Sequence, residues 1–248
     1  MNGGTNILLQ ELCLLIDVFI CFGVPIIGII ILSRKYGKVR KAFFIGMCAF
    51  VVSQILLRIP ILKLVLPNFI WYIKLQLNPY LYGIFLGLSA GVFEESARLV
   101  FMKGFLKGRT READGLAFGL GHGGIEAMLI TGIGYISSLI LYPLGKVDLS
   151  GVGNLDLLIG GMERVFAMCF HVGASLIILY GIREHKALRY TILAILLHGL
   201  LDSMLVILPA AIGLGIMGIE IYIIIISILV LAFALRLFSK SSISIPSE

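Results

Sequence analysis

The chain has 248 residues, of which 59% are hydrophobic and only 14% charged, with a mean hydropathy of +1.06. Soluble domains usually carry about a quarter charged residues, so this composition excludes an ordinary water-soluble protein. The net charge of +6 would suggest nucleic-acid binding in a soluble protein, but in a membrane protein it is expected to set topology instead.

Seven apolar stretches are each long enough to cross a bilayer, which takes roughly 20 residues. Only helices and closed barrels satisfy the backbone in lipid, and these stretches are too long for barrel strands. The sequence therefore predicts an all-α, polytopic integral membrane protein, with one transmembrane domain over 1–238 and a short cytoplasmic tail over 239–248. The predicted helices lie at about 8–33, 42–59, 79–102, 114–141, 158–181, 189–209 and 212–236.

Lysine and arginine are distributed unevenly between the two sets of loops that alternate along the chain. One set carries fourteen of these residues and the other carries four. The richer set comprises 34–41, 103–111, 183–189 and 236–240, and the poorer set contributes Arg58, Lys63, Lys74 and Lys146. Cytoplasmic loops are the basic ones, so we expect the N-terminus outside, the C-terminus in the cytoplasm, and a multi-pass protein of a bacterial-type plasma membrane.

Charged and imidazole side chains lie inside four of the predicted helices. An ionisable residue within a membrane span is costly and indicates a functional site. The fourth histidine, His185, falls in a basic loop and is expected to be solvated. The intramembrane residues, in chain order, are Glu94, Glu95, Arg98, His122, Glu126, Glu163, Arg164, His171, His198 and Asp202.

Several of these side chains are predicted to share one depth in the membrane. A helix rises about 1.5 Å per residue, which places the paired glutamates and the three histidines roughly 8–12 Å from the cytoplasmic face. Glu126, Arg164 and Asp202 form a second layer at about 18–21 Å. Because the four helices alternate in direction, this coincidence of level predicts a single site.

Glycines recur every four residues on two of these helices, at Gly83, Gly87 and Gly91 and again at Gly115, Gly119 and Gly123. Such stripes let membrane helices approach closely. We therefore expect helix 79–102 to pack on helix 114–141, which would bring Glu95 toward His122. Glu94 would then pair with Arg98 at the i,i+4 spacing.

Three histidines and several carboxylates at one level make a set of metal ligands. Zinc is bound by His and Asp/Glu side chains, and a catalytic zinc site leaves one position for water. A nearby glutamate can act as general base on that water. The second-layer carboxylates would orient the imidazoles or serve as ligands themselves. A proton- or ion-coupled carrier also holds such residues at mid-depth and is the alternative from another functional class.

Four motifs within 83–205 resemble those of the intramembrane metalloprotease superfamily that includes CAAX prenyl endopeptidases, Abi/CPBP proteins and PrsW. Within it, the chain is most similar to the YhfC family. The resemblance implies that one glutamate of the pair activates water together with His122, while the other motif residues hold the metal or position the substrate. The motifs are F-E-E-S-A-R at 93–98, F-x-x-x-H at 118–122, M-E-R at 162–164 followed by His171, and H-x-x-x-D at 198–202.

This resemblance leads to a specific metal-site hypothesis within a catalytic core at about 79–209. His122, His171 and His198 would hold a divalent metal, expected to be zinc. Asp202 or Glu126 would be a further ligand or an orienting group. The reaction would be cleavage of a peptide bond in a membrane-associated peptide or protein.

The remaining intramembrane residues receive catalytic or supporting roles in the same hypothesis. Glu95 would deprotonate the water, with Glu94 fixed by Arg98. The Glu163–Arg164 pair would neutralise the upper carboxylates or contact the substrate. A membrane scaffold or immunity protein that keeps the polar cluster without proteolysis is the other alternative, and some members of the superfamily are of that kind.

Overall fold

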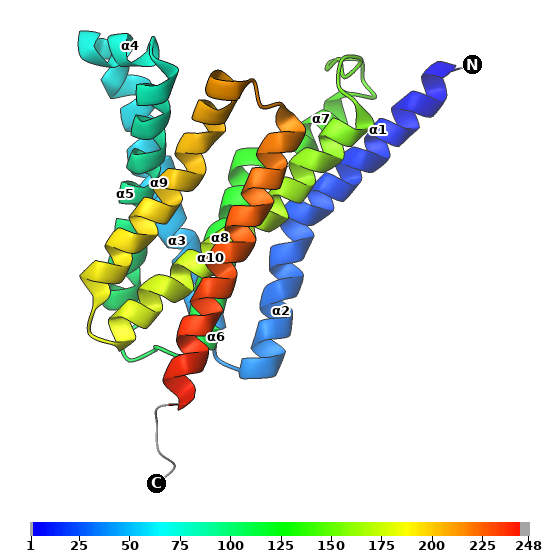
Figure 1. Cartoon of the computed structure of the whole chain (residues 1–248). Helices are drawn as coiled ribbons and strands as arrows, with labels where there is room; N and C mark the ends of the chain where they lie inside the picture. The colour runs from blue at the N-terminus through cyan, green and yellow to red at the C-terminus, as the bar shows by residue number, and fades with distance from the viewer. Residues whose placement is uncertain (1, 244–248) are drawn as a thin grey trace.

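The computed structural model describes the backbone of residues 2–243 and the side chains of residues 8–239, and this part of the chain is helical without a strand. Helices stand side by side along one long axis, and α1 begins at the opposite end of the bundle from the end of α10 (Figure 1). The segments, with η marking π-helical or 3₁₀ stretches, are α1 (Asn2–Val18), η1 (Phe19–Gly23), α2 (Val24–Tyr36), α3 (Arg40–Phe50), η2 (Val51–Arg58), η3 (Ile61–Val65), η4 (Leu66–Asn68), α4 (Ile70–Gln76), α5 (Pro79–Phe105), α6 (Glu112–Glu126), η5 (Ala127–Gly132), α7 (Ile133–Leu141), α8 (Asn154–Arg183), α9 (Ala187–Ile212) and α10 (Ile216–Ile243).

Among the described residues, six continuous helical stretches are long and apolar enough to cross a membrane: Leu8–Tyr36, Arg40–Asn68, Glu112–Leu141, Asn154–Arg183, Ala187–Ile212 and Ile216–Ser239. The 27-residue α5 is comparable in length, but Glu94, Glu95 and Arg98 lower its hydropathy. It lies along α9 in the bundle (Figure 1) and is the helix that would complete the seven predicted crossings. Helix α10 continues into the predicted tail as far as Ile243, and residues 244–248 lie outside the described part.

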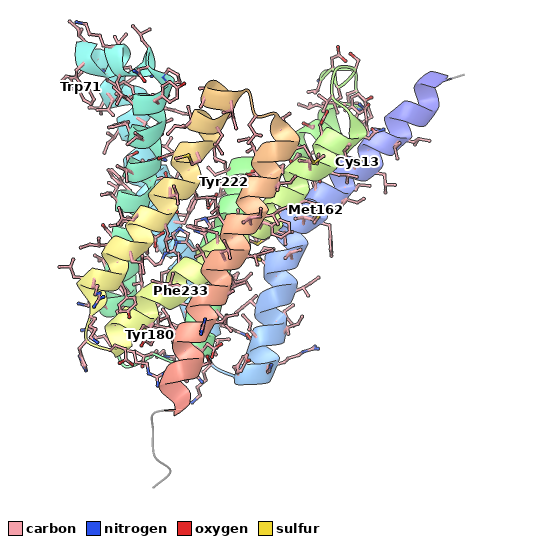
Figure 2. All side chains as sticks on the ribbon, in the orientation of Figure 1. Cys13, Trp71, Met162, Tyr180, Tyr222 and Phe233 are labelled. Carbon is pink, nitrogen blue, oxygen red and sulfur yellow. The ribbon has the colours of Figure 1, made fainter. Side chains whose placement is uncertain are left out.

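The two ends of the bundle differ in charge. In Figure 1 the α4 end is at the top and comprises α4, residues 142–153 and residues 213–215. The basic end is at the bottom and comprises residues 37–39, 106–111 and 184–186. Trp71 lies at the α4 end and Tyr180 nearer the basic end (Figure 2). This arrangement groups the loops as the alternating count of basic residues predicted.

Wide π-helical turns interrupt three of the spans. Stretch η1 ends just before Pro25, and η2 and η3 flank Pro60. Proline lacks a backbone N–H and its ring crowds the preceding turn, so the helix accommodates it by local widening. Gln54 and Arg58 lie on η2, and η5 begins directly after Glu126, so polar residues occur at these irregular turns.

The glycine stripes of α5 and α6 pack against different partners from the one predicted. A Cβ at Gly91 would lie 2.6 Å from the Ile195 carbonyl oxygen of α9, whereas a Cβ at Gly119 would lie 2.4 Å from Val172 Cα of α8. The prediction that the two stripes dock on each other was wrong, because a stripe permits close approach without specifying the neighbour. The structure instead places α5 against α9, and α6 against α8.

A third close crossing joins α3 to α6. A Cβ at Gly46 would lie 2.1 Å from the Phe118 carbonyl oxygen, and one at Gly121 would lie 2.0 Å from the Phe43 carbonyl oxygen. Backbones this close leave no room for any side chain at the crossing. The crossing places the second span beside His122, whose ring lies 5.4 Å from the Phe50 ring.

Candidate metal centre

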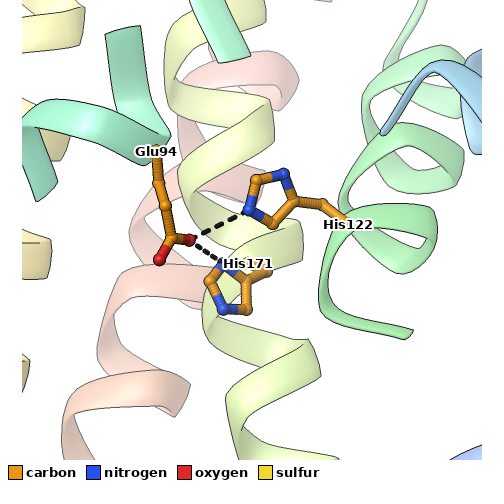
Figure 3. A group of neighbouring side chains, drawn as sticks. All are labelled: Glu94, His122 and His171. Carbon is orange, nitrogen blue, oxygen red and sulfur yellow. Dashed lines mark hydrogen bonds and ion pairs between the residues drawn. The ribbon is translucent and has the colours of Figure 1, made fainter. Parts of the chain in front are cut away.

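Three buried side chains from three helices converge in the bundle: Glu94 of α5, His122 of α6 and His171 of α8 (Figure 3). Each offers a ligand atom, and these atoms all lie within 4.8 Å of one another. Glu94 Oε2 is 3.0 Å from His122 Nε2 and 3.9 Å from His171 Nδ1. Two ligands bonded to a tetrahedral zinc ion at about 2.0–2.1 Å are about 3.3 Å apart, so this spacing fits a metal.

Apolar and aromatic packing fixes the His122 ring. The ring is fully buried, with the edge of Phe50 on one side and Phe118 stacked at 6.4 Å. Its Nδ1 atom has no hydrogen-bond partner among the described atoms. The orientation of this imidazole is therefore set by packing rather than by a hydrogen bond to an outer group.

Glu94 is oriented by residues from two other helices. Gln54 Nε2 of η2 donates a hydrogen bond to Glu94 Oε1, and His198 Nε2 of α9 lies 3.8 Å from the same oxygen. The other oxygen, Oε2, faces the two imidazoles of His122 and His171. Glu94 is thus the glutamate of the pair that belongs to the cluster.

Glu95 points away from the cluster and binds Arg98. Arg98 Nε donates to Glu95 Oε2 at 2.8 Å and Nη2 donates to Oε1 at 3.2 Å. His198 Nδ1 lies 2.8 Å from the same Oε1. The predicted pairing of Glu94 with Arg98, and the predicted approach of Glu95 to His122, were therefore wrong. Packing of α5 on α9 turns Glu95 toward His198 and leaves Glu94 for the cluster.

Arg98 connects this ion pair to His171. It is fully buried and donates from Nη1 to the His171 carbonyl oxygen at 3.1 Å and to Ser175 Oγ. Its Nη2 atom lies 3.1 Å from His171 Nδ1. A metal on Nδ1 would take the place of that hydrogen bond, because the nitrogen has one lone pair.

The other side of His171 faces the second layer. Glu126 Oε2 lies 2.5 Å from His171 Nε2, and Arg164 Nη1 lies 3.5 Å from Glu126 Oε1. Arg164 is also paired with Glu163, its neighbour on α8. A carboxylate on the far nitrogen of a ligand histidine orients the ring and raises its basicity. Glu126 Oε2 lies close enough to His171 Nε2 for that role.

His198 and Asp202 adjoin the cluster without joining its closest set. His198 Nε2 is 3.6 Å from Asp202 Oδ2, and the Asp202 side chain is 33% exposed. Of the three predicted histidine ligands, the described structure brings His122 and His171 together with Glu94 at ligand spacing. His198 instead bridges both glutamates of the pair.

A cavity of about 440 Å³ reaches this cluster. Glu94, His171 and His198 line its inner part, and Asp202, Glu126 and Arg164 line its polar wall. The apolar wall includes Leu62, Leu86, Leu205, Val206 and Ile223, from four helical segments nearer the α4 end. The cavity therefore includes the second span and α10, beyond the four helices that the sequence predicted.

Gln54 and Arg58 are site residues that sequence reasoning missed. Arg58 was assigned to an outer loop, but it lies in η2 within the Arg40–Asn68 span and lines the cavity. Its Nη2 donates to the Leu86 carbonyl oxygen at 2.7 Å, and its Nη1 donates to Gln54 Oε1 at 3.2 Å. The i,i+4 spacing of Gln54 and Arg58 on an otherwise apolar stretch was the available signal.

A bundle of apolar helices that encloses two histidines and a glutamate at ligand spacing defines a candidate metal site inside a membrane protein. Residues 20–149 and 146–225 match the family described as YhfC intramembrane metalloprotease. The chain is also 35% identical over 205 residues to a Bacillus subtilis (strain 168) protein described as "Uncharacterized membrane protein YhfC", covering 74% of this chain and 79% of that relative. No solved structure matches.

The chain therefore belongs to the YhfC family, as the resemblance of its motifs implied. The family match and the all-helical bundle confirm the predicted class of polytopic helical membrane protein.

Proposed function

We propose that this protein is an intramembrane metal-dependent endopeptidase of a bacterial-type plasma membrane. Its substrate would be a membrane-associated peptide or protein. The observation that carries the proposal is the buried group of Glu94, His122 and His171, with ligand atoms within 4.8 Å of one another. The family description supports the same activity.

The donor set of two imidazoles and one carboxylate suits zinc. When bound there by Glu94, His122 and His171, the metal would activate water and polarise a peptide carbonyl. Glu126 would hold the His171 ring in place through its contact with Nε2. Arg98 would hold Glu95 away from the reacting groups.

Glu94 is the carboxylate of the pair that we propose as a metal ligand. It lines the cavity, whereas Glu95 has both oxygens bound by Arg98. His198, 3.8 Å from Glu94 Oε1 and 3.6 Å from Asp202, would donate a hydrogen bond to the leaving group. The apolar wall of the cavity would exclude bulk water, which strengthens electrostatic interactions within the site.

Metal content tests the ligand set directly. Elemental analysis of detergent-purified wild type should find about one zinc per chain, as expected for a single metal site. The double variant His122→Ala/His171→Ala should lose it. The control is His185→Asn, since His185 lies in the basic end at φ 56° and Asn tolerates that conformation. Equal metal in all three proteins would exclude this ligand set.

Proteolysis requires a separate assay, in which the protein is reconstituted in liposomes with fluorescence-quenched transmembrane peptides. Glu94→Gln removes a metal ligand and should lower cleavage by at least about 100-fold, because even the outer partners of metal ligands are worth about 10–100-fold. 1,10-Phenanthroline should abolish cleavage and added zinc should restore it. Cleavage that survives both Glu94→Gln and His122→Ala would exclude the mechanism. Proton flux without cleavage would favour the ion-coupled carrier. The absence of both cleavage and proton flux would favour the membrane scaffold.

A further inference from the structure

A second cavity, of about 430 Å³, lies at the basic end of the bundle, far from the metal centre along the helices. It is formed where the end of α2, the turn into α3 and the α5–α6 loop meet. Its lining is Ser33, Lys38, Arg40, Lys41 and Arg109. Four of these five residues are cationic, so the cavity suits an anion.

Carboxylates neutralise this cavity only weakly. Within the described residues, Lys38, Arg40 and Lys41 form no ion pair. Arg109 Nη1 lies 3.8 Å from Asp114 Oδ1, and that carboxylate is already bound by Arg111 at 2.9 Å. The positive charge therefore remains available to a ligand.

Backbone contacts hold the cavity open and add neutral donors. Arg109 Nη1 donates to the Lys38 carbonyl oxygen at 2.5 Å, which ties the α5–α6 loop to the α2–α3 turn. The hydroxyl of Ser33 is buried without a hydrogen-bond partner among the described atoms. Helix α3 begins at Arg40 without a side-chain cap, so its first N–H groups are unsatisfied and can bind a phosphate.

An apolar groove of about 320 Å³ lies farther along α3. Its lining is Phe44, Met47, Cys48, Val51, Val52 and Ile125. Lys41, Phe44 and Cys48 are spaced i, i+3 and i+7, which places them on one face of the helix. A cationic cavity at the basic end and an apolar groove nearer the membrane interior are therefore both lined by residues of α3.

We propose that these two features form one binding site for an anionic phospholipid. The headgroup phosphate lies in the cavity against Lys38, Arg40, Lys41 and Arg109. An acyl chain lies in the groove along α3. The groove distinguishes a lipid from free phosphate, because a soluble anion has no acyl chain to place against apolar surface.

Native mass spectrometry of the purified protein tests the site, with phosphatidylglycerol as the anionic probe and phosphatidylcholine as the zwitterionic one. Wild type should retain phosphatidylglycerol in preference. Arg40→Gln/Lys41→Gln should weaken its binding about 30-fold, since each cation near a membrane surface contributes about 1 kcal/mol. The matched control, Lys63→Gln/Lys74→Gln, removes two cations from the region of the α4 end and should change nothing. An equal loss in the control would overturn the proposal.

Two further experiments distinguish binding of a lipid from binding of free phosphate. Cys48→Phe fills the groove and leaves the cationic cavity intact, so it should weaken phosphatidylglycerol binding. Inorganic phosphate should compete poorly with the lipid. If phosphate raises the unfolding temperature of wild type as much as phosphatidylglycerol does, and Cys48→Phe has no effect, the site is one for a soluble anion and the lipid proposal is wrong.

Discussion

Adjacent carboxylates at Glu94 and Glu95 have different surroundings because one helical step turns them toward different helices. Glu94 faces His122 and His171, whereas Glu95 is bound by Arg98 and His198. Replacing each by glutamine keeps its shape and removes its charge. The two substitutions should therefore separate metal binding from stability.

Glu94→Gln should lose the metal while keeping a folded protein. Glu95→Gln should still bind the metal through Glu94, His122 and His171. Its free energy of unfolding should fall by about 3–5 kcal/mol, because Arg98 would be a buried charge without its partner. Metal content and thermal unfolding in one detergent check both effects. Glu112→Gln, at the basic end, is the control. The reverse pattern, with metal lost only in Glu95→Gln, would show that Glu95 belongs to the metal centre, as the sequence had predicted.

Glu126 should influence the metal through His171. Its Oε2 lies 2.5 Å from His171 Nε2, so Glu126→Ala removes the group that orients the ring. Such outer partners are worth about 10–100-fold in metal affinity, measured by competition with a fluorescent zinc chelator. Glu163→Ala is the control, since Glu163 contacts Arg164 rather than the imidazole. Equal affinities in the two variants would contradict the orienting role.

The residue types of the site could be predicted from the sequence, but their pairings could not. The charged and histidine residues of the motifs lie in the cluster, in contact with it or in the adjoining cavity wall. They could be predicted because charge inside a membrane span is rare and can be recognised in a single sequence. Arg98 lies within reach of both glutamates, at i+3 and i+4, and helix spacing alone does not choose between them. The choice depends on which neighbour α5 packs against.

Helix packing depends on the glycine positions at the crossings. A Cβ at Gly91 would lie 2.6 Å from a carbonyl oxygen of α9, whereas a Cβ at Gly104, on the same helix, would meet nothing within 4 Å. Gly91→Ala should separate α5 from α9 and destabilise the protein by about 1–3 kcal/mol. Gly104→Ala should be neutral or slightly stabilising. Thermal unfolding of both proteins tests this, and equal stabilities would contradict the close crossing.

Sequence patterns located the helices better than their ends and partners. The length of each apolar stretch identified the spans. The second helix was predicted to end at residue 59, between Arg58 and Pro60, but it continues to Asn68. Wide turns around the proline keep the chain helical, and hydropathy does not reveal them. Four-residue glycine spacing likewise indicated close contact without naming α9 or α8 as the partner.

The whole molecule should be oriented by its basic end, which we predict to be cytoplasmic. In a cysteine-free background, Ser150→Cys in the 142–153 loop should react with a membrane-impermeant maleimide added to intact cells. Lys107→Cys, in the loop between α5 and α6, should react only after the membrane is permeabilised. Labelling of Lys107→Cys in intact cells, with Ser150→Cys protected, would show the opposite orientation.

The charged residues that line the cavity or bind the cluster do not balance one another. The five carboxylates are Glu94, Glu95, Glu126, Glu163 and Asp202, and the three guanidinium groups are Arg58, Arg98 and Arg164. With neutral imidazoles, two negative charges remain in a compartment surrounded by hydrocarbon. A divalent cation would make the compartment electroneutral. Without one, protons would have to supply the missing charge, so metal uptake should release up to about two protons per chain.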